Sequence, residues 1–104
     1  MEEKQEYSIE EEEKRMDFSA LEERLGELDS HAFIQAEREC RMNADPTPDI
    51  MYSAAFRARL AATAMGVGYE EISRLKLPEY TAVISRVLVF LLGTLGETVI
   101  QRSK

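Results

Sequence analysis

The chain has 104 residues, a single cysteine and a formal net charge of −7. It therefore holds at most one domain and cannot form a disulfide within itself. No stretch reaches the ~18 apolar residues that a membrane-spanning helix needs, and the acidic beginning does not resemble a signal peptide. These features predict a soluble protein of the cytoplasm.

The negative charge is concentrated at the beginning of the chain. Residues 1–29 contain twelve acidic and four basic residues, a net charge of −8, whereas residues 30–104 contain eight acidic and nine basic residues, a net charge of +1. Residues 1–16 are also poor in apolar side chains, so we expect a flexible acidic lead before a single helical domain at 17–104. Neither part has a run of basic residues, which argues against nucleic-acid binding.

A short helix is expected first. Ser19 and Glu22 have the spacing of a capping box, in which each side chain bonds the backbone amide of the other residue. Gly26 suits a left-handed residue at the end of this helix.

A second helix is predicted from Asp29 or Ser30, either of which can cap its first turn, to Asn43. The prolines of "DPTP" then prevent its continuation. Its apolar stripe contains Phe33, Ala36 and Cys40. The position of the cysteine on this stripe favours a small core residue over a reactive thiol.

The third helix is predicted to begin with Thr47 as its cap and Pro48 in its first turn, and to end at Gly66. One face is rich in alanine, which lets another backbone approach closely. This face contains Ile50, Met51, Ala54, Ala55, Ala58, Ala61, Ala62 and Met65.

One or two helical turns are expected at "GYEEISRL", followed by a last long helix with Pro78 in its first turn. At 100° per residue, the apolar stripe of that helix contains Tyr80, Val83, Ile84, Val87, Leu88, Leu91 and Leu95. Val89 falls opposite this stripe, and Phe90 and Leu92 fall on its flanks. A strand at 86–92 is an alternative, but the long periodicity favours a helix, and no second strand is available for pairing. The expected fold is all-α, a compact bundle of about four to five helices.

Catalytic chemistry is not indicated. His31 is the only histidine, and no cysteine or second histidine stands at metal-ligand spacing from it. The carboxylates at Glu10–Glu13 lack the spacing and the glycine of a calcium loop. No glycine-rich phosphate loop follows a strand. We therefore expect neither an enzyme nor a bound metal or cofactor.

Residues 17–92 share a pattern of apolar spacings with a known family. The matching positions are Ala36–Glu37, the break at Pro46–Pro48, "AATAMG" at 61–66, Glu71–Ile72 with Leu75, Glu79–Tyr80 and Phe90–Leu91. With these elements, about three quarters of the chain resembles the small tail assembly chaperones of long-tailed bacteriophages. The acidic first sixteen residues are not part of the pattern.

The resemblance implies a non-enzymatic protein of the bacterial host cytoplasm. Proteins of that family coat the long, helical, aggregation-prone tape measure protein before the tail tube closes around it. Many also exist in a longer, frameshifted form that recruits tail tube subunits. The implied partners are the tape measure protein and, for such a longer form, the tail tube protein.

A protein that shields apolar helices needs an apolar surface of its own. We predict that this surface contains Val89, Phe90, Leu92, Ala54, Ala58 and Ala61. A symmetric dimer that covers the same residues is the alternative, and the two are compatible. Two other functions remain open: an acidic nucleic-acid mimic that inhibits a DNA-binding protein, and a small structural subunit of the tail.

Overall fold

The computed structural model describes residues 16–103, with the backbone alone for 94–103. This part of the chain contains five α-helices and one short 3₁₀ helix, and no strand. The elements are α2 (Leu21–Gly26), α3 (Ser30–Met42), η1 (Ile50–Tyr52), α4 (Ala54–Met65), α5 (Tyr69–Ser73) and α6 (Leu77–Ser103). The all-α prediction is confirmed. The strand alternative at 86–92 is wrong, because α6 runs through it without interruption.

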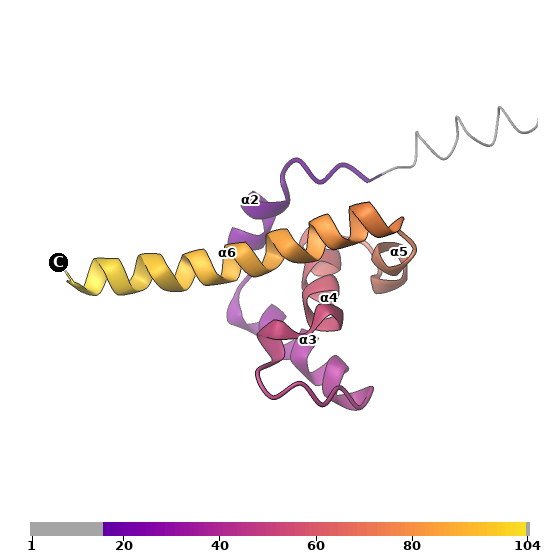
Figure 1. The fold of residues 1–104 in the computed structure, drawn as a ribbon, viewed down its shortest axis with the longest axis horizontal. Helices are drawn as coiled ribbons and strands as arrows, with labels where there is room; N and C mark the ends of the chain where they lie inside the picture. The colour runs from indigo at the N-terminus through magenta and orange to yellow at the C-terminus, as the bar shows by residue number, and fades with distance from the viewer. Residues whose placement is uncertain (1–15, 104) are drawn as a thin grey trace, which may run out of the picture.

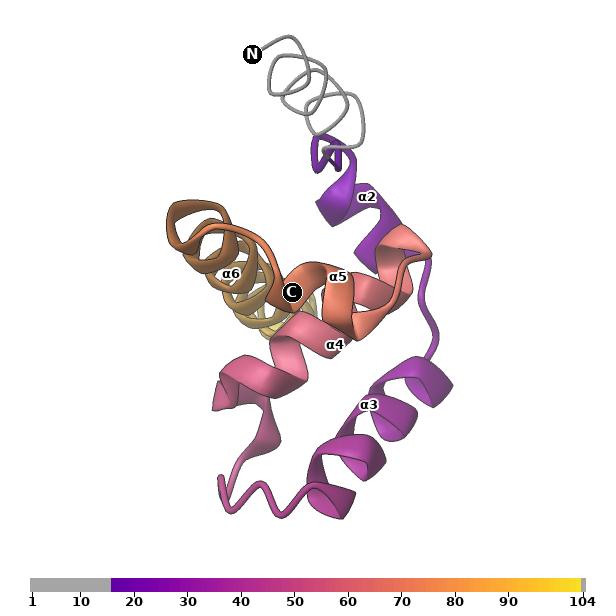
Figure 2. The same ribbon diagram turned by 90° about the vertical axis from the view of Figure 1, so that its right-hand side faces the viewer.

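The central element is α4, which contacts α2, α3, α5 and α6 (Figure 1). Figure 2 shows α6 on one side of α4 and α3 on the other. The sequence of α4 explains this position, because four small alanines let neighbouring helices approach closely. Its buried residues are Phe56, Ala58, Leu60, Ala61, Ala62 and Ala64.

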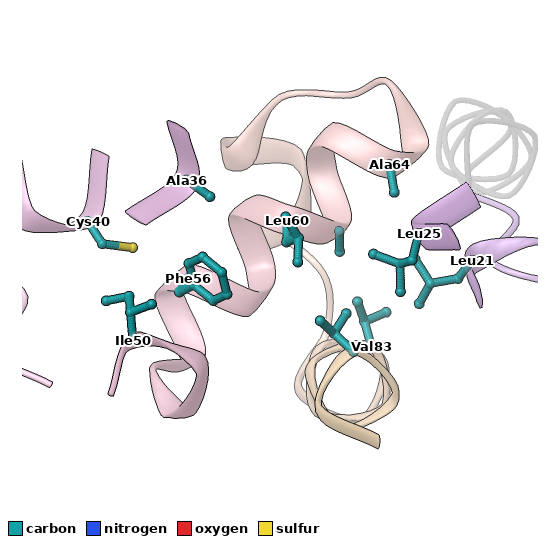
Figure 3. Close-up of a cluster of buried hydrophobic side chains, with 11 residues drawn as sticks. Leu21, Leu25, Ala36, Cys40, Ile50, Phe56, Leu60, Ala64 and Val83 are labelled. Atoms are coloured by element: carbon teal, nitrogen blue, oxygen red, sulfur yellow. The ribbon is translucent and has the colours of Figure 1, made fainter. Parts of the chain in front are cut away.

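The buried side chains form two clusters around α4. The main cluster, drawn in Figure 3, contains Leu21, Leu25, Ala36, Cys40, Ile50, Phe56, Leu60, Ala61, Ala64, Val83 and Val87. The small cluster contains Ala58, Ala62 and Ile72. Within the core, the rings of Phe33 and Phe56 meet edge to face with centroids 4.7 Å apart. Cys40 is 1% exposed, so its prediction as a core residue is confirmed.

Two predicted helix ends are confirmed. The Asp29 carboxylate accepts a hydrogen bond from the backbone N–H of Ala32 at 3.2 Å and so caps α3. Gly66 follows α4 with φ of +70°, a left-handed conformation that strains any residue with a Cβ. The start of α3 and the end of α4 are therefore set by local signals that are visible in the sequence.

The predicted signals around α2 are wrong. Ser19 and Glu22 form no capping box, because the Glu22 carboxylate binds Arg86 of α6 instead. The backbone N–H of Ser19 donates to Asp17 at 3.0 Å. Gly26 does end α2, but Gly66 is the one left-handed glycine within the described residues. The backbone hydrogen bonds at the two ends of α2 are local, from Leu21 to Phe18 and from Glu27 to Arg24.

The third helix begins later than predicted. Ile50–Tyr52 forms the separate helix η1, and Ser53 then caps α4 by accepting the backbone N–H of Phe56 at 3.2 Å. Thr47 is not a cap, because its hydroxyl donates to the Asp45 carboxylate at 2.7 Å. The Ser53 hydroxyl donates to the same carboxylate. These hydrogen bonds from Ser53 and Thr47 lower the pKa of Asp45 to about 2.

The described part of the chain begins at residue 16, the last residue assigned to the acidic lead. Residues 1–15, which include Glu10–Glu13, lie outside the described residues. Met16 and Phe18 pack against the small cluster. The packed body therefore includes Met16, which the sequence assigned to the lead.

Candidate partner-binding surfaces

The alanine face of α4 is covered by the chain itself. Ala58 and Ala61 are both 0% exposed, and Ala54 is half-buried. Ala58 packs in the small cluster with Ile72 of α5, and Ala61 belongs to the main cluster with side chains of α2 and α6. The predicted docking surface is corrected for these two alanines: the helices that approach them belong to the same chain.

The three predicted residues of α6 separate into two environments. Val89 is 68% exposed and Leu92 is 42% exposed. Phe90, in contrast, packs against the main cluster, and its ring lies near Gly26 of α2. Leu88, which the helical projection placed on the core stripe, is only half-buried. The reason is the position of α2, which covers the Phe90 flank of α6.

A surface pocket of about 270 Å³ lies beside this Phe90 flank. Its walls come from α2, α3, α4, α6 and the loop before α3, and we call it the α2–α6 pocket. It is lined by Leu25, Leu28, Asp29, Ser30, Phe33, Leu60, Phe90 and Leu91. Small-molecule sites measure ~300–1,000 Å³. This pocket lies just below that range, and its mostly apolar walls suit an anchoring side chain from another protein.

The outer face of α6 carries no exposed charge between Leu77 and Gly93. Its exposed residues are Leu77, Pro78, Thr81, Ala82, Ser85, Val89, Leu92 and Gly93. The two charged residues in the same stretch, Glu79 and Arg86, are half-buried. A helix face exposed to water normally carries charged and polar residues. The outer face of α6 is instead typical of a surface that another protein covers.

Arg86 is held against α2 and not directed to a partner. Its guanidinium donates to Glu22 at 2.8 Å and to the backbone carbonyl of Phe18 at 2.8 Å. The hydrogen bond from Arg86 holds the pKa of Glu22 below its usual value, and the same bond raises the pKa of Arg86. This pair fixes the segment 18–26 to α6.

The described residues were compared with the arrangements that hold a metal ion or activate a cysteine. No group of three or more His, Cys, Asp or Glu side chains there is placed to hold a metal ion. Burial raises the pKa of the Cys40 thiol, which disfavours the reactive thiolate. No helix in this part of the chain is both long enough and apolar enough to span a membrane.

Sequence reasoning missed the α2–α6 pocket. Leu25 and Leu28 are three residues apart around the end of α2, and this spacing was the available signal. They line the same pocket as Phe90, more than 60 positions later, because α2 lies against α6. Such a long-range arrangement leaves no local pattern in the sequence.

Comparisons with protein families, with curated proteins and with solved structures find no match to this chain. The function is therefore inferred from the surfaces described above and from the sequence pattern.

Proposed function

We propose that this protein is a tail assembly chaperone of a long-tailed bacteriophage, which binds and shields apolar helices of the tape measure protein. The α2–α6 pocket is the observation that carries the proposal. It is an apolar depression next to a long helix, and an amphipathic client helix docks in such a place through one or two large side chains. The resemblance of residues 17–92 to that chaperone family supports the same reading.

The chemistry of the pocket favours an apolar client over a charged one. Six of its eight lining residues are apolar, and the polar pair, Asp29 and Ser30, stands at the start of α3. The Asp29 carboxylate is engaged with the backbone N–H of Ala32. Burying a leucine or phenylalanine side chain in such a site contributes roughly 1.5–3 kcal/mol. Because a millimolar dissociation constant already requires about 4 kcal/mol, a client helix needs further apolar contacts beside this anchor.

The direct test fills the pocket without touching the core. Ser30→Trp adds a large side chain to an exposed residue that lines the pocket. His31→Trp is the matched control, because His31 is exposed on the next position of α3 and does not line the pocket. Each variant is compared with the wild type for the affinity of a labelled tape measure helix and for the soluble yield of a co-expressed tape measure fragment.

We expect Ser30→Trp to weaken peptide binding at least about tenfold and to lower the soluble yield, since the pocket is occupied. His31→Trp is expected to behave as the wild type. Equal binding by both variants would reject the pocket as the client site. Retention of the chain in purified tails would favour a structural tail subunit, and inhibition of a DNA-binding protein would favour the acidic mimic.

A further inference from the structure

We propose that two copies of this chain pair through the outer face of α6, with the two helices antiparallel. The pairing uses four exposed residues, Ala82, Ser85, Val89 and Leu92, which we call the α6 seam. The seam lies on the opposite side of α6 from Val87, which is fully buried in the main cluster. It is therefore separate from the α2–α6 pocket.

The spacing of the seam is that of a helix–helix contact. Its residues follow one another at intervals of three, four and three, which keeps them in one line along an α-helix that packs on another helix. Every member is uncharged, and the nearest charged residue, Arg86, is held by Glu22 and the Phe18 carbonyl. A second copy of this face therefore meets it without like-charge repulsion.

The sizes of the seam residues indicate that a second copy of α6 packs on the seam, and that it runs antiparallel to the first. The two residues nearer the start of α6 are small, Ala82 and Ser85, and the two nearer its end are large, Val89 and Leu92. In an antiparallel pair centred between Ser85 and Val89, Ala82 of each copy faces Leu92 of the other, and Ser85 faces Val89. Small residues then oppose large ones along the whole contact, which fills the space between two straight helices evenly. A parallel pair would place alanine on alanine and leave a gap.

The length of α6 supports the same arrangement. A helix of 27 residues is about 40 Å long, and Figure 1 shows its later half extending beyond the other helices. A single projecting helical segment of this length is marginally stable in water. Antiparallel pairing places residues 90–97 of the projecting half beside residues 77–84 of the other copy's α6.

The rest of the chain leaves room for this pairing. Figure 2 looks nearly along α6 and shows the other helices gathered on one side of it. In this register residues 77–97 of the two helices overlap over ~30 Å. Such a contact hides several hundred Å² on each copy, which is below the ~800 Å² per partner of a standard stable interface. We therefore expect a symmetric dimer with a dissociation constant near the micromolar range.

Sedimentation of the full chain between about 1 and 100 µM tests the dimer. Leu92→Glu is expected to raise the dissociation constant at least about tenfold, because it places a carboxylate in the seam twice per dimer. Leu77→Glu is the matched control: Leu77 is an exposed leucine of the same helix that stands away from the seam, and its variant is expected to dimerise normally. Circular dichroism verifies that both variants are folded. A monomeric wild type at ~100 µM, or equal dimerisation of the two variants, would overturn the proposal.

Disulfide trapping tests the direction. In the antiparallel pair, a chain with Ser85→Cys and a chain with Val89→Cys cross-link when mixed, and neither cross-links well alone, because equivalent positions lie beyond the ~7 Å reach of a disulfide. Cys40 is buried and gives little background. Efficient cross-linking of each single chain with itself, and not of the mixture, would overturn the antiparallel register.

Discussion

The two most apolar helices of the molecule, α4 and α6, differ in how much of their surface the chain covers. Four neighbouring helices surround α4, and its alanines let them approach closely. One side of α6 packs on the body through Val83 and Val87, while its outer face leaves Val89 and Leu92 in contact with water. Both helices are rich in apolar residues, so composition does not explain the difference. The exposure of their apolar side chains depends on where each helix lies in the bundle.

The largest expected difference between the two helices comes from truncating one apolar side chain in each. Phe56 of α4 is 0% exposed, so Phe56→Ala should lower the free energy of unfolding by ~3–5 kcal/mol. Val89 of α6 is 68% exposed, so Val89→Ala should change it by less than ~0.5 kcal/mol. Urea denaturation at ~0.1 µM, well below the expected dissociation constant of the dimer, measures both. A loss above ~1.5 kcal/mol for Val89→Ala would show that the body covers this residue.

A smaller difference is expected from enlarging an alanine in each helix. Ala61→Leu inserts a larger side chain between α4 and its neighbours and should cost ~1–3 kcal/mol. Ala82→Leu on the exposed side of α6 should stay within ~0.5 kcal/mol under the same dilute conditions. If Ala61→Leu were also neutral, the close packing around α4 would be wrong.

Helical periodicity predicted most of the fold, including the side of α6 that meets the core. It placed Val83 and Val87 inward and Val89 outward, as the structure has them. It could not predict which neighbour covers a face, so the alanine face of α4 was assigned to a partner although the chain's own helices fill it. Periodicity also failed for Phe90, because only the three-dimensional path of α2 brings Gly26 against that ring.

The polar signals were harder to interpret than the apolar ones. Glu22 had the spacing of a local capping residue, but it pairs with Arg86, 64 positions away. Thr47 had the position of a cap before the third helix, but its hydroxyl donates to Asp45, and Ser53 caps α4 instead. When a polar side chain has several possible hydrogen-bond partners, the fold determines which partner it binds, and the local sequence does not show this.

The start of α4 is capped by a serine, whereas Ser85 of α6 is exposed. Ser53→Ala removes the cap of α4 and should cost ~1 kcal/mol, whereas Ser85→Ala on the exposed face of α6 should be neutral. Ser53→Ala also removes the hydrogen bond from Ser53 to Asp45, so it should raise the pKa of Asp45 from about 2 toward its usual value of 3.8.

The sign of the pH dependence follows from that pKa. A lowered pKa in the folded chain gives stability that is present above pH ~4 and is lost as the pH falls toward ~2. The Ser53→Ala variant should therefore lose less stability than the wild type over this interval. NMR titration of the Asp45 carboxyl and denaturation at several pH values measure the two effects. An unchanged pKa in the variant would mean that Ser53 does not hold this carboxylate.

The smallest effect is expected at the contact that attaches α6 to α2. Glu22→Gln keeps the shape of the side chain but removes its charge, and the pair with Arg86 is partly exposed, so the loss at neutral pH should be at most ~1 kcal/mol. Because Arg86 lowers the pKa of Glu22 from 4.5, the stability from this pair is present above that value and is lost as the pH falls below it. The difference between wild type and variant should accordingly shrink between pH 6 and pH 3, and also in 1 M salt. Glu23→Gln, on the next, exposed position of α2, is the control and should show no such difference. A gap between wild type and Glu22→Gln that persists unchanged at pH 3 would mean that shape, and not charge, holds α2 against α6.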